Sequence, residues 1–318
     1  MWDFPLLPVA ASTTANEVDA LFYTLVAISL FFSGLITIGL VYFTIRYRKN
    51  SKASRANPQS ENLPLELLWS IIPLMISMGI FGWAAKVFFD MHVPPANARE
   101  VYVVAKQWMW KIQHPQGNRE INELHVPIGV PVKLVMTSQD VIHSFFIPAF
   151  RLKQDVLPGR YTTLWFEATK TGEFHLFCAE YCGTSHASMK GRVVVMKQED
   201  FERWLADATP GEPMISTGEK LFRQYGCSTC HSQDTQERGP SLHGLFGKSV
   251  RLADGSTRIA DNNYIRESIL DPNAALVAGY KPLMPTYTQQ LSQEQLFALI
   301  EYIKSLGGPQ VAASRRTQ

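Results

Sequence analysis

Residues 178–189 read CAEYCGTSHASM, and this segment gathers side chains that bind soft metal ions. It has two cysteines four residues apart, a histidine four residues later and a methionine three residues after that: Cys178, Cys182, His186 and Met189. Another histidine, His143, lies upstream. Thiolate, imidazole and thioether groups together favour copper. The segment therefore predicts a copper site; the alternative is a disulfide between the two cysteines in an ordinary loop.

The number of cysteines bears on the kind of copper site. A mononuclear blue-copper site needs one cysteine, two histidines and one weak axial ligand. Here two thiolates can bridge two copper ions, each capped by one histidine, which leaves one weak axial ligand per metal. The pattern therefore favours a binuclear centre.

The residues around this segment have the composition of short β-strands. Runs rich in valine, threonine and aromatic residues alternate with turns rich in proline, glycine and asparagine; the runs are VYVVAKQWMWKI, PVKLVMTS, RYTTLWFEA, GEFHLF and GRVVVMK. This texture predicts an all-β sandwich or barrel. We place this domain at residues 93–208, with a short helix over 199–208 at its end.

A second motif, CSTCH at residues 227–231, is the attachment signature of a c-type haem. Cys227 and Cys230 would form the thioether bonds, and His231 would bind the iron. A thioredoxin-like pair or half a zinc site is disfavoured, because no βαβ pattern and no second ligand pair accompany the motif. For the sixth iron ligand we choose Met284, which lies in a proline-bounded loop, over Met214, which lies before the motif.

The residues after 208 predict an all-α domain over 214–308. Capping boxes at Ser216/Glu219 and Ser292/Gln295 predict two of its helix starts. A linker rich in proline and glycine at 209–213 precedes the domain and would let it move, and a polar tail follows at 309–318.

The first 92 residues predict a transmembrane hairpin. Two uncharged runs, of 26 residues from Ala20 to Ile45 and 19 from Leu67 to Ala85, give spans at about 20–45 and 65–88. The alternative for each run is a buried core helix, and neither resembles a cleaved signal peptide. The connecting loop carries five cations, Arg46, Arg48, Lys49, Lys52 and Arg55. The positive-inside rule places this loop in the cytoplasm, and both termini and both remaining domains on the other side.

The copper segment resembles the CuA domain of cytochrome c oxidase subunit II, which has a cupredoxin-like fold. Residues 239–247, GPSLHGLFG, resemble the segment after CxxCH in class I cytochromes c. The resemblance implies that Cys178 and Cys182 bridge two coppers, and that His143 and His186 cap them. It makes Met189 and the backbone carbonyl of Glu180 the weak ligands. It also makes the carbonyl of Pro240 the acceptor for the axial histidine of the haem.

Three further residues match the same family. Trp108, in Gln107-Trp108-Met109-Trp110, corresponds to the tryptophan that passes electrons toward CuA, although the family usually has tyrosine in place of Met109. The Glu180 side chain resembles a ligand of a magnesium ion shared with subunit I; the alternative is a solvated carboxylate. Glu66 resembles the entrance of a proton path into subunit I, and the alternative is an acid near a helix N-terminus.

The combined motifs resemble the fused subunits of bacterial caa-type oxidases. The resemblance implies an electron-transfer subunit of a proton-translocating cytochrome c oxidase, with oxygen reduction on subunit I. Its partners would be the other oxidase subunits, the lipid bilayer of a bacterial plasma membrane, and a donor such as cytochrome c or a quinol-oxidising complex. The net charge of +2 indicates no nucleic-acid partner. The alternatives are a CuA subunit of a nitric oxide reductase and a membrane-anchored electron shuttle.

Overall fold

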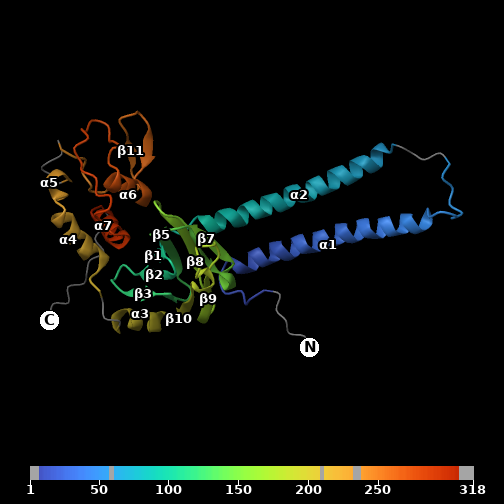
Figure 1. Ribbon diagram of the computed structural model, residues 1–318, viewed down its shortest axis with the longest axis horizontal. Coiled ribbons are helices and arrows are strands. Elements are labelled where there is room, and N and C mark those ends of the chain that lie inside the picture. Colours follow the sequence, from blue (N-terminus) through green and yellow to red (C-terminus); the bar gives the residue numbers. More distant parts are fainter. Residues whose placement is uncertain (1–6, 57–60, 208–210, 232–237, 308–318) are drawn as a thin grey trace.

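The computed structural model describes residues 7–56, 61–207, 211–231 and 238–307. The predicted linker at 209–213 is described only from residue 211, and the predicted tail at 309–318 lies outside the described residues. The chain forms a long helical hairpin, a β-sandwich and a helical domain, which we define as residues 214–307 (Figure 1). This architecture confirms the predicted fold class.

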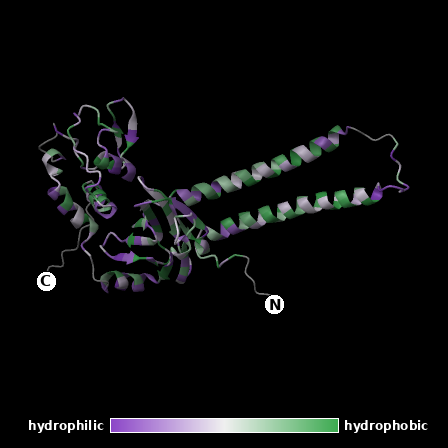
Figure 2. Cartoon of the chain, viewed as in Figure 1, coloured by the Kyte–Doolittle hydropathy of each residue, from purple (hydrophilic) through white to green (hydrophobic). Residues whose placement is uncertain are grey.

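The hairpin consists of α1 (Ala15–Arg46) and α2 (Leu63–His92). Both helices are longer than the predicted spans, and both are long and apolar enough to cross a membrane. Each helix has a long central stretch that is mostly apolar and is not buried by the rest of the chain, with hydrophilic residues toward its ends (Figure 2). A helix that is apolar all round needs an apolar surrounding, which a bilayer supplies.

The sandwich packs two five-stranded sheets face to face. The first has the order β3-β2-β1-β5-β8, and the second has the order β4-β10-β9-β6-β7. The strand bounds are β1 (Arg99–Lys106), β2 (Met109–Gln113), β3 (Arg119–Ile121), β4 (Glu123–Pro127), β5 (Pro131–Ser138), β6 (His143–Ile147), β7 (Leu152–Val156), β8 (Thr162–Glu167), β9 (Gly172–Cys178) and β10 (Lys190–Met196). Short 3₁₀ helices lie at Pro148–Phe150 and His186–Ser188, and α3 (Gln198–Asp207) follows β10.

The side chains of β1 alternate between two hydrophobic cores, one inside the sandwich and one in the helical domain. Val101, Val103 and Ala105 point into the sandwich. Tyr102 and Val104 point out of it and pack with the helical domain. Because successive strand side chains point to opposite faces, one strand serves both cores.

The helical domain contains α4 (Met214–Gln224), α5 (Ser228–His231), α6 (Asn262–Leu270) and α7 (Gln293–Ser305), and a small sheet of β11 (Ser249–Arg251) and β12 (Thr257–Ile259) that the sequence did not predict. The Ser292/Gln295 capping box is confirmed. The Ser216/Glu219 box is wrong, because α4 already begins at Met214, after Pro213. Burial of Met214 in the core favours this earlier start.

The hairpin is attached to the sandwich at the start of α1 and at the end of α2. Before α1, the Ala11 and Thr13 amides donate to the Ala149 and Glu167 carbonyls, at 2.9 and 3.1 Å. In the last turn of α2, the Asp90 carbonyl accepts a hydrogen bond from the Trp165 indole at 3.1 Å.

Candidate metal and haem sites

The copper-segment residues converge in a buried cluster at one end of the sandwich. Cys178 ends β9, His143 begins β6, and the other residues lie in the loop before β10. The two sulfur atoms are 3.7 Å apart, and both cysteines are free thiols. A disulfide needs about 2.05 Å between its sulfur atoms. The described thiols therefore have the separation of two metal ligands and not of a bond.

Four further donors surround the two sulfur atoms. The Nδ1 atom of His143 lies 3.9 Å from the Cys178 sulfur and 3.1 Å from the Met189 sulfur. The Nδ1 atom of His186 lies 3.5 Å from the Cys182 sulfur. The Glu180 carbonyl lies 3.2 Å from the Cys178 sulfur. Two thiolates, two imidazoles, a thioether and a carbonyl form a donor set that fits copper.

Two further residues, for which the sequence predicted no role, form hydrogen bonds with this cluster. Asp140 accepts a hydrogen bond from His143 Nε2 at 2.8 Å, which leaves Nδ1 with a free lone pair. The side chain of Gln107 donates to the Cys182 carbonyl at 2.8 Å, beside the Trp108 indole at 3.2 Å. The Asp140 contact is local, since Asp140 lies three residues before His143, whereas the Gln107 contact depends on how distant segments meet.

Gly183 lets these donors approach the loop. Its φ is +114°, and a Cβ there would lie 2.8 Å from the Gln107 amide nitrogen. Any side chain would be strained by the backbone and would push this donor away.

The electrostatics differ between the two thiols. Burial raises the pKa of Cys178, but the neighbouring His143 ring and hydrogen bonds from backbone amides outweigh burial and lower this pKa to about 6. Burial and the neighbouring Cys178 raise the pKa of Cys182. One thiol therefore ionises readily, whereas the second needs a cation to become a thiolate.

The CxxCH residues line a separate cavity of about 400 Å³ in the helical domain. Cys227, Cys230, His231 and Met284 all lie on its wall. The Nδ1 atom of His231 lies 2.8 Å from the Pro240 carbonyl. Since a carbonyl only accepts, Nδ1 carries the proton and Nε2 keeps the lone pair that an iron ion needs. The cavity thus fits a haem with two axial ligands.

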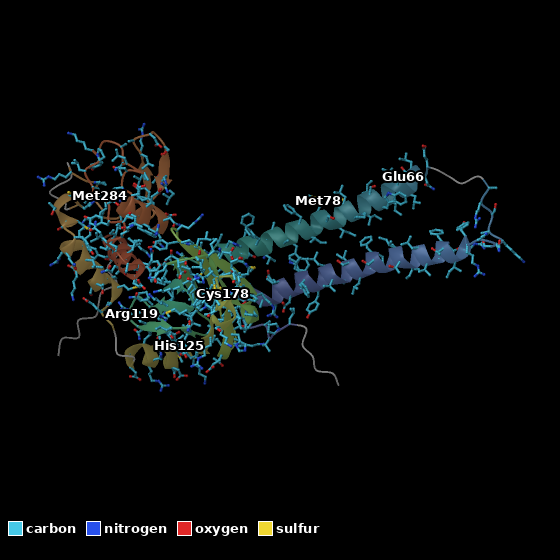
Figure 3. All side chains as sticks on the ribbon, in the orientation of Figure 1. Glu66, Met78, Arg119, His125, Cys178 and Met284 are labelled. Carbon is cyan, nitrogen blue, oxygen red and sulfur yellow. The ribbon has the colours of Figure 1, made fainter. Side chains whose placement is uncertain are left out.

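The two sites lie in different parts of the molecule. In Figure 3, Cys178 lies in the sandwich near the helical hairpin, and Met284 lies in the helical domain. Glu66 lies at the far end of α2, away from both. Its carboxylate accepts from the Asn62 amide at 3.2 Å, so it helps to cap the helix.

Three family models match the chain. They are cytochrome c oxidase subunit II, transmembrane domain, over residues 1–84; cytochrome c oxidase subunit II, periplasmic domain, over 100–197; and cytochrome c over 215–307.

Individual relatives agree with these matches. A cytochrome c oxidase subunit 2 of Synechocystis sp. is 31% identical over 253 residues, covering 64% of this chain and 76% of that protein. A cytochrome c oxidase subunit 2 of Alkalihalophilus pseudofirmus is 28% identical over 292 residues, which cover 85% of this chain and 82% of that protein. The crystal structure of the periplasmic domain of subunit II of cytochrome oxidase of Bradyrhizobium japonicum is 32% identical, covering 36% of this chain and 96% of that chain, with a TM-score of 0.35.

Proposed function

Because this chain belongs to the cytochrome c oxidase subunit II family, we propose that it carries electrons from a covalent haem c, through a binuclear copper centre, to the subunit that reduces oxygen. When bound, the haem and the copper pair would supply the one-electron carriers. Oxygen reduction and proton pumping would take place on a haem-copper subunit I. The convergence of four further copper-type donors around two free thiols carries this proposal.

The copper ligands divide into two groups around the bridging thiolates of Cys178 and Cys182. His143 and Met189 would bind one copper, because their ligand atoms are 3.1 Å apart. His186 and the Glu180 carbonyl would complete the other. Asp140 would hold the His143 ring in the correct tautomer.

In the helical domain, Cys227 and Cys230 would anchor the haem covalently, and His231 and Met284 would supply ligands to its iron. Pro240 would orient His231 by accepting its Nδ1 proton. A methionine ligand opposite a histidine raises the haem potential, as suits a donor near the oxidising end of a respiratory chain.

Three residues would connect the chain to its partners. Trp108 would take part in electron entry, since its indole donates to the copper-loop carbonyl of Cys182. The Glu180 side chain is exposed, so it is free to share a magnesium ion with subunit I. Glu66 would mark the entrance of a proton path, beyond its role in capping α2.

The chain would sit in a bacterial plasma membrane with the α1–α2 loop in the cytoplasm. The five cations of that loop, against the single acid Glu61, support this orientation. The sandwich and the helical domain would then face the periplasm, where a cytochrome c or a quinol-oxidising complex would deliver electrons.

The test is to purify the complex from its native membrane in mild detergent, with Cys182→Ser as the matched variant. We expect oxygen uptake, a c-type band on this chain, and copper beyond the content of subunit I. The variant should keep the haem and lose the additional copper. Nitric oxide turnover without oxygen uptake would replace this proposal with a reductase, and a chain purified with both cofactors but without partners would indicate a shuttle.

A further inference from the structure

The helical domain is docked on the outer face of the sandwich by an aromatic cluster. Phe297 of α7 lies 4.6 Å from Tyr102 and 4.8 Å from Tyr161, measured between ring centroids. All three side chains are almost fully buried, with exposed fractions of 1 to 3%. Tyr102 and Tyr161 belong to the sandwich, so this burial exists only while the domains are together.

Polar contacts surround the aromatic cluster and fix its orientation. The Tyr161 amide donates to the Asn263 side chain at 2.7 Å, and that side chain donates back to the Tyr161 carbonyl at 3.2 Å. Lys304 forms ion pairs with Glu100 of β1 and with Glu301 of its own helix. Such paired, directional contacts allow one relative orientation and disfavour sliding.

A second attachment holds the start of the helical domain. The Met214 amide donates to the Pro115 carbonyl at 3.0 Å. Gly117 and Gly211 lie so close that a Cβ on Gly117 would stand 2.2 Å from the Gly211 carbonyl oxygen. The described end of the linker is therefore packed against the β2–β3 turn and does not lead to a freely tethered domain.

This arrangement connects the docking surface to the haem cavity through one helix. Phe297 and Lys304 of α7 contact the sandwich, while Leu299 and Ile303 of the same helix line the cavity. A change in docking therefore moves a wall of the haem site relative to the copper site. The linker composition predicted a mobile helical domain, whereas these contacts hold the domain against the sandwich.

We propose that Tyr102, Phe297 and Lys304 are positioning residues that hold the helical domain in a single orientation on the sandwich. The inference rests on the proposed function, since it concerns the path between the haem and copper sites. Electron transfer between these sites would then occur in one fixed geometry, without a search by a tethered domain. An external donor would find the outer face of β1 and β5 already covered.

Hydrogen–deuterium exchange on the full chain in detergent tests the docking without reference to either cofactor. The reporter is the amide of Tyr161, whose hydrogen-bond acceptor belongs to the other domain. In the wild-type chain, a peptide spanning residues 157–161, which ends before β8, should be protected. Exchange as fast as that of the exposed turn at Lys170 would overturn the proposal.

Lys304→Glu places a third carboxylate beside Glu100 and Glu301, and should speed exchange of this peptide by roughly 30-fold or more. Lys304→Arg should restore protection, and Lys153→Glu, which breaks an exposed ion pair with Asp155 within the sandwich, is the matched control. Peptides from β10 report whether the sandwich stays folded. If Lys304→Glu fails to fold, Lys111→Glu, which breaks the 3.1 Å interdomain pair with Glu294, takes its place.

The internal haem-to-copper electron-transfer rate supplies a second readout. It should not change with solvent viscosity in the wild-type chain, and it should become viscosity-dependent in Lys304→Glu. A wild-type rate that falls with viscosity would refute the fixed geometry. Failure of the proposed function would be seen separately, as loss of copper or haem from a chain whose Tyr161 amide stays protected.

Discussion

Glu100→Gln should remove a pH-dependent part of the stability of the docked structure. Glu100 lies at the domain interface with its side chain 20% exposed, and it contacts Lys133 at 2.8 Å and also Lys304. Burial raises the pKa of Glu100, but the two ammonium groups outweigh burial and lower this pKa from 4.5 to about 2. Since one pKa unit corresponds to about 1.4 kcal/mol, the charged form contributes about 3 kcal/mol to stability.

The direction of the pH dependence follows from the lowered pKa. The contribution of Glu100 is fully present above its unfolded-state pKa of 4.5, and is lost as the pH falls through about 2. At pH 7 the variant should therefore be less stable than the wild-type chain by about 3 kcal/mol, and this difference should shrink toward zero between pH 4.5 and 2.

The assay is urea unfolding of the full chain in detergent at a series of pH values, followed by near-ultraviolet circular dichroism. Glu173→Gln is the matched control, because Glu173 pairs with Arg192 at an exposed site. The control should differ little from the wild-type chain at any pH. A wild-type-to-Glu100→Gln difference that stays constant from pH 7 to pH 2 would refute the reasoning.

Three further substitutions probe the two sites and the helical core. Trp108→Phe removes a 3.2 Å hydrogen bond to Cys182 and should cost about 1 kcal/mol in unfolding experiments; it should slow electron entry but leave the copper content unchanged. Met284→Ala should keep the covalent haem and lower its potential in a redox titration; an unchanged potential would exclude this residue as the sixth ligand. Gly218→Ala would place a Cβ 2.0 Å from the Ala298 carbonyl oxygen and should destabilise the helical domain by about 1–3 kcal/mol in thermal unfolding, unless α4 and α7 can separate.

The sequence predicted the local motifs well because metal and haem chemistry require fixed spacings. The copper segment and CxxCH each gave candidate ligands that the structure brings together or places around one cavity. The transmembrane hairpin was predictable for a similar reason, since the thickness of a bilayer sets the length of an apolar run.

Contacts between distant segments were not predictable in this way. Gln107 reaches the Cys182 carbonyl of the copper segment only because β1 and β2 form a hairpin. The run VYVVAKQWMWKI is uniformly strand-like, so its composition did not reveal that turn. Docking of the two domains through Tyr102 and Phe297 likewise depends on tertiary packing, which the spacing of apolar residues along the sequence does not predict.

The double attachment of the hairpin has a consequence for assembly. The backbone hydrogen bonds before α1 and the Trp165–Asp90 contact in the last turn of α2 attach the sandwich to both helices. If the hairpin spans a bilayer, as proposed, these two attachments would fix the height and tilt of the copper segment above the membrane. If the chain delivers electrons to a partner in the same membrane, as proposed, that partner would have to present its acceptor at this level, and lengthening both helices by one turn would raise the sandwich by roughly 5 Å.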